Sequence, residues 1–210
     1  LDANTTATGN TALGRSSLSG NTTGSANVAA GAYALTANTT GANNTGIGYG
    51  ALDANTTGAS NTAIGKDAMI ANTTGTGNVA VGIDALQANT TAGTNTAVGK
   101  DAMYSNTTGY GVALGKGALY SNTTGSGNTA VGYQSLEDNT TASNNTALGD
   151  SALGANTTGG QNVAVGEGAG NSNTTGTSIC ALGRQALEAN TTGSNNTALG
   201  ERALFANTTG

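Results

Sequence analysis

A period of 17 residues runs through the chain and constrains its fold more than any other feature. Counted from its first asparagine, the unit reads N-[TV]-A-[VIL]-G-x-x-A-L-x-x-N-T-T-G-x-x, and its positions are numbered here 1 to 17. The period is broken once, between Gly99 and Gly115, by the loss of one residue that we expect to fall in a turn. Units start near residues 10, 27, 44, 61, 78, 95, 112, 128, 145, 162, 179 and 196.

The unit predicts an all-β fold. Seventeen residues are too few for helix-pair repeats of about 33 residues or more, and the unit is poor in the residues that cover helix surfaces. The stretch N-T-A-V-G places β-branched residues at alternate positions between Asn and Gly, which is typical of a short strand. We therefore expect a parallel β-solenoid, or β-roll, of about twelve 17-residue coils, in a trimer or a laterally packed fibre.

Residues 1–210 would form a single array. Because both ends cut through a unit, we expect a segment of a longer protein.

Stacked coils place equal positions above one another, so each position becomes a column. Position 4 is aliphatic from Leu13 to Leu199, and position 9 is Leu or Met except at Gly170. We expect these two columns to form the core. Because side chains alternate along a strand, position 2 should share the inward face with position 4, and Cys180 would then be buried.

Two columns of small residues should then face outward. Position 3 is Ala in every unit except at Gly46, and position 8 is Ala or Ser. A solvated face would vary more, so these columns indicate close approach to a second surface, either other chains or another wall of the same coil. We favour other chains. The candidate self-association face consists of Ala12, Ala29, Ala63, Ala80, Ala97, Ala113, Ala130, Ala147, Ala164, Ala181 and Ala198.

Positions 12 to 14 are Asn-Thr-Thr thirteen times without one substitution. Identical stacked amides and hydroxyls can form ladders between coils, which is the interpretation we favour. Asn-x-Thr is also the N-glycosylation acceptor pattern, and Asn43, Asn144 and Asn195 add three further matches. The candidate glycosylation sites in the Asn-Thr-Thr column are Asn4, Asn21, Asn38, Asn55, Asn72, Asn89, Asn106, Asn122, Asn139, Asn156, Asn173, Asn190 and Asn207.

Composition disfavours several function classes. The net charge of -5, with only six Lys and Arg residues, argues against nucleic-acid binding. No apolar run reaches the length of a membrane span. The absence of His, a single Cys and the lack of a phosphate-binding loop argue against an enzyme, and we expect no catalytic residue, metal site or cofactor.

Charged and aromatic residues gather at positions 6, 7 and 10, which predicts a solvated edge. Asp67, Asp84 and Asp101 stack at position 7 and are the best candidates for calcium ligands, although a plain charged edge is the interpretation we favour. Tyr104 and Tyr120 share a column and should stack, or present an aromatic strip to a sugar or partner. Adjacent threonines would leave only one outward column for ordering ice, because neighbouring strand residues point to opposite faces.

The phrases at 128–132, Asn-Thr-Ala-Val-Gly, and 145–149, Asn-Thr-Ala-Leu-Gly, resemble the repeats in the heads of trimeric autotransporter adhesins, and similar runs occur in phage tail-fibre-like proteins. The resemblance covers almost the whole chain. It implies left-handed parallel β-rolls packed three side by side, displayed outside bacteria and used for attachment. It assigns no binding residue to this chain.

We therefore expect a structural repeat segment of an extracellular bacterial fibre or adhesin, located outside the cell or at its surface. It would act as a passive scaffold for surface attachment or matrix, and its main partner would be itself, with surface glycans or matrix as further partners. The alternatives are a glycan-binding or ice-binding β-solenoid module and a phage tail-fibre shaft.

Overall fold

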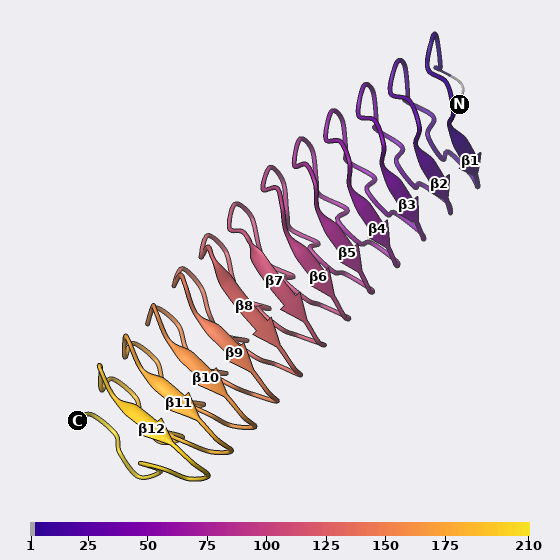
Figure 1. Cartoon of the computed structure of the whole chain (residues 1–210). Coiled ribbons are helices and arrows are strands. Elements are labelled where there is room, and N and C mark those ends of the chain that lie inside the picture. The colour runs from indigo at the N-terminus through magenta and orange to yellow at the C-terminus, as the bar shows by residue number, and fades with distance from the viewer. Residues whose placement is uncertain (1–2) are drawn as a thin grey trace. The chain divides into compact units, whose positions relative to one another are not determined.

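The computed structural model describes residues 3–210 and confirms an all-β parallel solenoid. Each coil of about 17 residues contributes one short strand. Within each of the two units named next, Figure 1 shows the coils following one another with their strands on one side. Two units are distinguished, one up to Thr108 with β1–β6 and one from Gly109 with β7–β12. The strands are β1 (Thr11–Leu13), β2 (Val28–Ala30), β3 (Thr45–Ile47), β4 (Thr62–Ile64), β5 (Val79–Val81), β6 (Thr96–Val98), β7 (Gly111–Leu114), β8 (Asn128–Val131), β9 (Thr146–Leu148), β10 (Val163–Val165), β11 (Cys180–Leu182) and β12 (Thr197–Leu199).

Neighbouring strands within each unit pair in parallel, in the register that the repeat dictates. Thr62 of β4 lies opposite Val79 of β5, and Ala130 of β8 lies opposite Ala147 of β9. A shift by one residue would bring unlike positions together and turn every side chain to the other face of the strand. The repeat therefore fixes the register.

The glycine at position 5 ends each strand in a conformation closed to other residues. The φ angles of these glycines lie between 119° and 143°. A Cβ atom built on Gly82 would lie 2.6 Å from the carbonyl carbon of Gly99 in the next coil. Both the backbone angle and the close approach of successive coils require glycine here.

Left-handed backbone recurs at positions 7, 9 and 17, where most residues are not glycine. In the coil that starts at Asn78, Asp84 has φ 57° and Leu86 has φ 52°. Because these residues reverse the usual alternation, positions 8 and 9 both turn inward, and Ala85 and Leu86 are fully buried. Position 9 is thus confirmed as a core column.

The inward face of the strands is opposite to the predicted one. Ala63 and Ala80 at position 3 are fully buried, whereas Ile64 at position 4 is 38% exposed and Val79 at position 2 is 36% exposed. The reason is space inside the coil. A Cβ atom built on Gly46, at position 3, would already lie 3.4 Å from Leu35 of the preceding coil. A narrow interior filled by position 9 admits only Ala or Gly at position 3, and the larger aliphatic residues remain outside.

The deletion falls in a turn, as predicted. The carbonyl of Tyr110 accepts a hydrogen bond from Gly127 N (2.9 Å). In an intact unit the position-16 residue Ser25 does the same, because its carbonyl accepts from the N–H of Asn43 in the next coil. The missing residue is therefore position 17. Gly111 lies opposite Asn128 and takes the place of the leading asparagine, so this unit starts one residue before the predicted Val112.

Candidate functional surfaces

The interior of the coils contains the predicted asparagine ladder. At position 12, Asn55 Nδ2 donates to Asn38 Oδ1 of the preceding coil (2.9 Å) and to Gly58 O of its own turn (3.0 Å). The same two bonds recur along the column, and the position-12 asparagines from Asn21 to Asn190 are fully buried. Each amide thus ties its own turn and links two coils, so the ladder satisfies polar groups that burial would otherwise destabilise.

A second asparagine column, at position 1, was missed by the sequence analysis. Asn44 N donates to Asn27 Oδ1 (2.9 Å), and Asn44 Nδ2 donates across the coil to Gly58 O (2.8 Å). The position-15 carbonyl therefore receives bonds from both asparagine columns. The recurrence of Asn at position 1 was the available signal, but nothing in the sequence shows that this side chain points inward.

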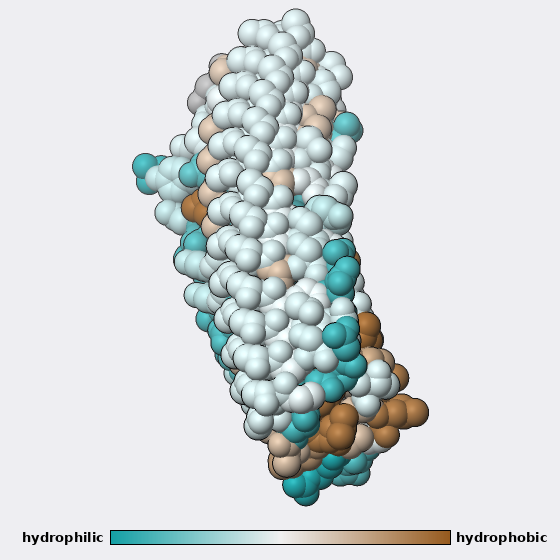
Figure 2. All heavy atoms as spheres, turned by 90° about the vertical axis from the view of Figure 1, so that its left-hand side faces the viewer, coloured by the Kyte–Doolittle hydropathy of each residue, from teal (hydrophilic) through white to brown (hydrophobic). Residues whose placement is uncertain are grey.

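The threonine at position 13 completes the contacts between turns. Thr56 Oγ1 donates to Thr73 O of the next coil (3.1 Å), so the hydroxyls bond to backbone carbonyls instead of to one another. The threonine at position 14, such as Thr57, is exposed. Figure 2 views the side on which these turns lie in Figure 1, and the face there is largely pale, as expected of threonine, glycine and serine.

The candidate self-association face of alanines is wrong. The position-3 alanines from Ala29 to Ala181 are fully buried inside a single chain, Ala198 is 2% exposed, and Ala12 in the first coil is half-buried. Apart from Ala12, no neighbouring molecule can reach them. The sequence left two explanations for the small residues, contact with other chains or with another wall of the same coil. The structure shows contact with the same coil.

The outward face of the strands is instead formed by positions 2 and 4. We call these two columns the strand face. Position 2 contributes Thr or Val, position 4 contributes Val, Ile or Leu, and Ala30 and Cys180 are the two smaller exceptions. Leu148 and Val165 illustrate the exposure in the middle of a unit, at 38% each. Cys180 was predicted to be buried but is half-buried on this face.

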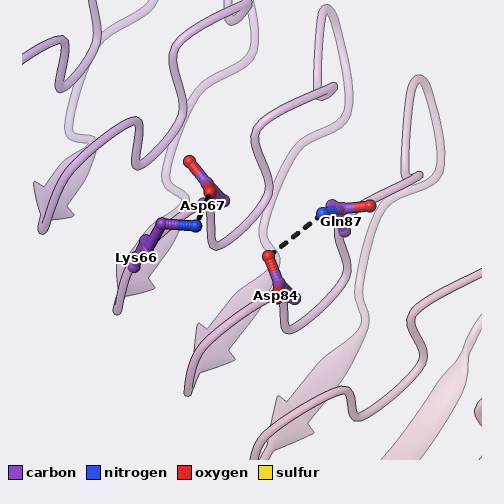
Figure 3. A network of polar contacts seen from close by, with 4 residues as sticks. All are labelled: Lys66, Asp67, Asp84 and Gln87. Carbon is purple, nitrogen blue, oxygen red and sulfur yellow. Dashed lines mark hydrogen bonds and ion pairs between the residues drawn. The ribbon is translucent and has the colours of Figure 1, made fainter.

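The strand face carries no charge. Every charged residue of the chain occupies position 6, 7, 10 or 11. Figure 3 shows residues of positions 6, 7 and 10: Lys66 Nζ lies 2.6 Å from Asp67 Oδ2, and Gln87 Nε2 donates to Asp84 Oδ1 (3.0 Å). The aspartates of position 7 thus have nearby partners in their own coils. Within residues 3–210 no group of three or more His, Cys, Asp or Glu residues could hold a metal ion.

The hydrogen bond and charge of Asp67 raise the pKa of Lys66 above its ordinary value of 10.5. A lysine whose pKa is higher in the folded state stabilises the fold at pH values below its unfolded-state pKa. This contribution is lost as the pH rises through its folded-state pKa. Since Lys66 is exposed, solvent screens the pair and the effect on stability is small. Similarly, Arg184 contacts Glu167 (3.4 Å) and Glu201 (3.1 Å) along position 6 at the surface.

Aromatic residues line the same charged edge in places. Arg15 lies 5.3 Å from the ring centroid of Tyr33, and Tyr33 meets Tyr49 edge-on at 5.6 Å. The predicted pair of Tyr104 and Tyr120 belongs to different units, so their stacking stays a prediction.

No pocket is found in the part of the chain that the structure describes. No helix among residues 3–210 is long and apolar enough to cross a membrane. The expectations on catalysis and cofactors stay predictions. The remaining candidates for function are therefore the exposed columns: the strand face, the position-14 threonines and the charged edge.

Comparison with known proteins gives no match: no family model fits the chain, and no curated protein or solved structure is significantly similar to it.

Proposed function

We propose that the chain is a structural repeat segment of an extracellular bacterial fibre or adhesin, a passive scaffold whose copies associate laterally through the strand face. The observation that carries this proposal is a pair of charge-free columns on the outside of each unit, in which position 4 is aliphatic throughout and position 2 is Thr, Val or Cys. The resemblance of the repeat to adhesin heads and tail-fibre-like proteins supports the extracellular setting.

The strand face offers aliphatic side chains to an interface between copies. In β1–β6 the Val, Ile and Leu side chains of positions 2 and 4 are 36% to 71% exposed, apart from the half-buried Val81. Large exposed apolar patches mark interaction surfaces. Covering this face would remove Val, Ile and Leu side chains from water, which favours association.

The charge pattern favours the same face. Copies of a chain with a net charge of -5 repel one another, and the repulsion is smallest where no charge is present. The charged edge at positions 6, 7, 10 and 11 would remain solvated and keep the assembly soluble. A second copy is therefore the partner whose chemistry best fits the strand face.

Sedimentation velocity tests this proposal. The unmodified chain should sediment at a multiple of its 20.0 kDa mass. Placing charge on the strand face with Ile64→Glu and Val98→Glu should give the monomer. The matched control, Thr74→Glu and Thr108→Glu, changes exposed position-14 residues of the same two coils and should leave the mass unchanged. An unmodified chain that stays at 20 kDa over all concentrations would refute the proposal, as would face variants that still associate.

A binding module is the second candidate, supported by the exposed threonine at position 14 of every described coil. None of these hydroxyls is needed for a contact between coils, since the neighbouring position-13 threonine supplies that bond. A regular column of hydroxyls could order water at an ice surface or meet a glycan. Thermal hysteresis and binding to a glycan array measure these activities, and a Thr57→Ala, Thr74→Ala, Thr91→Ala variant should lose them if this role is real.

A further inference from the structure

The Asn-x-Thr triplets of the chain fall into two classes that differ in burial. At position 12 the asparagines from Asn21 to Asn190 are fully buried. Asn72 illustrates their bonding, because its Nδ2 donates to Asn55 Oδ1 (2.8 Å) and to Gly75 O (3.2 Å). Both amide hydrogens are in use, and neighbouring coils cover the side chain. A sugar on this nitrogen cannot coexist with the folded coil.

The second class lies at position 17 and consists of Asn43, Asn144 and Asn195, all of them exposed. Their φ angles are 60°, 62° and 61°, so each has a left-handed backbone two residues before a strand begins. The backbone N–H groups are used, as Asn43 N donates to Ser25 O (3.0 Å). Within residues 3–210 the three side-chain amides make no hydrogen bond, which leaves Nδ2 accessible.

The threonine that completes each triplet is also accessible. Thr45, Thr146 and Thr197 lie at position 2, on the outward side of their strands, and are half-buried or exposed. Their hydroxyls make no side-chain hydrogen bond in the described part of the chain. The acceptor amide and the hydroxyl two residues later, which together define the N-glycosylation pattern, are therefore both presented at the surface.

The fold does not require asparagine at these three positions. Ala26, Ser60 and Gln161 occupy position 17 of other coils with φ between 58° and 61°. Asparagine tolerates left-handed backbone well, but so do its replacements here.

We propose that Asn43, Asn144 and Asn195 are N-glycan attachment sites that are modified in the folded coil, while the ladder asparagines are excluded. The proposal rests on the extracellular role proposed above. In the reaction, Nδ2 attacks the anomeric carbon of a nucleoside diphosphate sugar. The C–N bond forms as the bond from that carbon to the diphosphate oxygen breaks, the nucleoside diphosphate leaves, and one amide proton passes to a base of the transferase.

The test uses a soluble N-glycosyltransferase that acts on Asn-x-Thr, with UDP-glucose as donor. The enzyme is first shown to modify a free peptide spanning residues 41–47. The folded chain should then gain up to three hexoses, and peptide mapping should place them at the three position-17 sites. Each of Asn43→Gln, Asn144→Gln and Asn195→Gln should remove one hexose. Occupancy at the ladder sites from Asn21 to Asn190 should be at least tenfold lower, and should rise when the chain is denatured before the reaction.

Two results would overturn the proposal: no hexose at the three sites of the folded chain, or equal occupancy at the ladder sites of a chain that circular dichroism shows to be folded. The sedimentation of the unmodified chain tests the proposed function separately. Because Thr45, Thr146 and Thr197 belong to the strand face, association through that face would also cover the triplets, so the reaction is run on the monomeric Ile64→Glu, Val98→Glu variant. A variant that accepts no sugar would reject only the attachment sites, and an unmodified chain that stays monomeric and accepts three hexoses would reject only the scaffold.

Discussion

At position 9 the residue type follows from the backbone angle. Leu or Met occupies this position with φ between 51° and 56°, and Gly170 is the one exception, at 59°. Neither Val nor Ile appears there, although both are common at position 4. A β-branched side chain is strained at positive φ, whereas Leu and Met carry their branch or bulk farther from the backbone. Position 9 therefore selects an unbranched Cβ as well as an apolar side chain.

Replacing Leu86 by Ile tests whether the positive φ at position 9 disfavours a β-branched residue. The two residues have equal volume, so the expected loss of about 1–3 kcal/mol in the free energy of unfolding comes from backbone strain. Leu148→Ile, at position 4 of β9, is the matched control and should change stability by less than about 0.5 kcal/mol. Urea denaturation measures both. Equal effects would show that the left-handed angle at position 9 does not govern the choice of residue.

Gly82 and Gly77 both have positive φ, but only Gly82 lies close to the backbone of the next coil. Comparing them separates the cost of an unfavourable φ from the cost of a steric clash between coils. A Cβ atom on Gly82 would meet the backbone of Gly99, whereas one on Gly77 (φ 67°) would meet nothing within 4 Å. Gly82→Ala should therefore destabilise the chain by about 3 kcal/mol or more, because coils must move apart. Gly77→Ala should cost about 1 kcal/mol, since only the angle is unfavourable. Thermal denaturation that ranks the two variants in the reverse order would contradict the coil geometry.

At the scale of the coil, the asparagine ladder links neighbouring coils through buried side chains, in addition to the backbone hydrogen bonds. Asn55→Ala would leave Asn38 Oδ1 without its donor and Asn72 Nδ2 without one acceptor in a buried environment. We expect a loss of about 3 kcal/mol. Thr57→Ala in the same coil removes an exposed hydroxyl and should change stability by less than about 0.5 kcal/mol. Chemical denaturation of both variants makes the comparison, and similar losses would show that the ladder contributes little.

Two successive coils each depart from the repeat at one place, and the two departures compensate each other. Gly170 replaces the usual Leu of position 9, and Ile179 replaces the usual Asn of position 1 in the next coil. A Cβ atom on Gly170 would lie 3.4 Å from Ile179 Cδ1 and 3.1 Å from Leu153 Cδ2, so larger neighbours fill the space that a leucine would take.

A double-mutant cycle checks this compensation. Gly170→Leu alone should overpack the coil, and Ile179→Asn alone should leave a cavity, whereas the double variant restores the repeat. We expect the two changes to couple by at least about 1.5 kcal/mol in the free energy of unfolding. Additive losses would indicate that the two departures are independent.

The sequence allowed the solenoid, the ladder and the turn at the deletion to be predicted, because a repeat stacks each position on itself. It did not allow the inward face to be predicted. Ala at position 3 and Ile or Val at position 4 look like an outer and an inner column, and hydrophobic patterning alone assigns them that way. The structure reverses them because left-handed residues at positions 7 and 9 bring Leu86 and its equivalents across the coil, leaving room only for Ala80 and its equivalents.

At the scale of the whole molecule, this reversal limits the surfaces that the proposed association between copies can use. The alanine column lies inside the coil, so copies that associate laterally would use the strand face, the threonine turns or the charged edge. The strand face alone combines aliphatic side chains with an absence of charge. The single thiol of the chain, Cys180, lies at position 2 of the strand face. Two copies that pack through their strand faces would therefore approach each other near this thiol.

A cryo-electron microscopy map of assembled chains tests the central claim most directly. We expect neighbouring chains to meet through positions 2 and 4, with Ile64, Val98 and Leu148 excluded from solvent and the threonine turns facing outward. A map in which the strand faces remain bare while chains contact through the threonine turns or the charged edge would contradict the account.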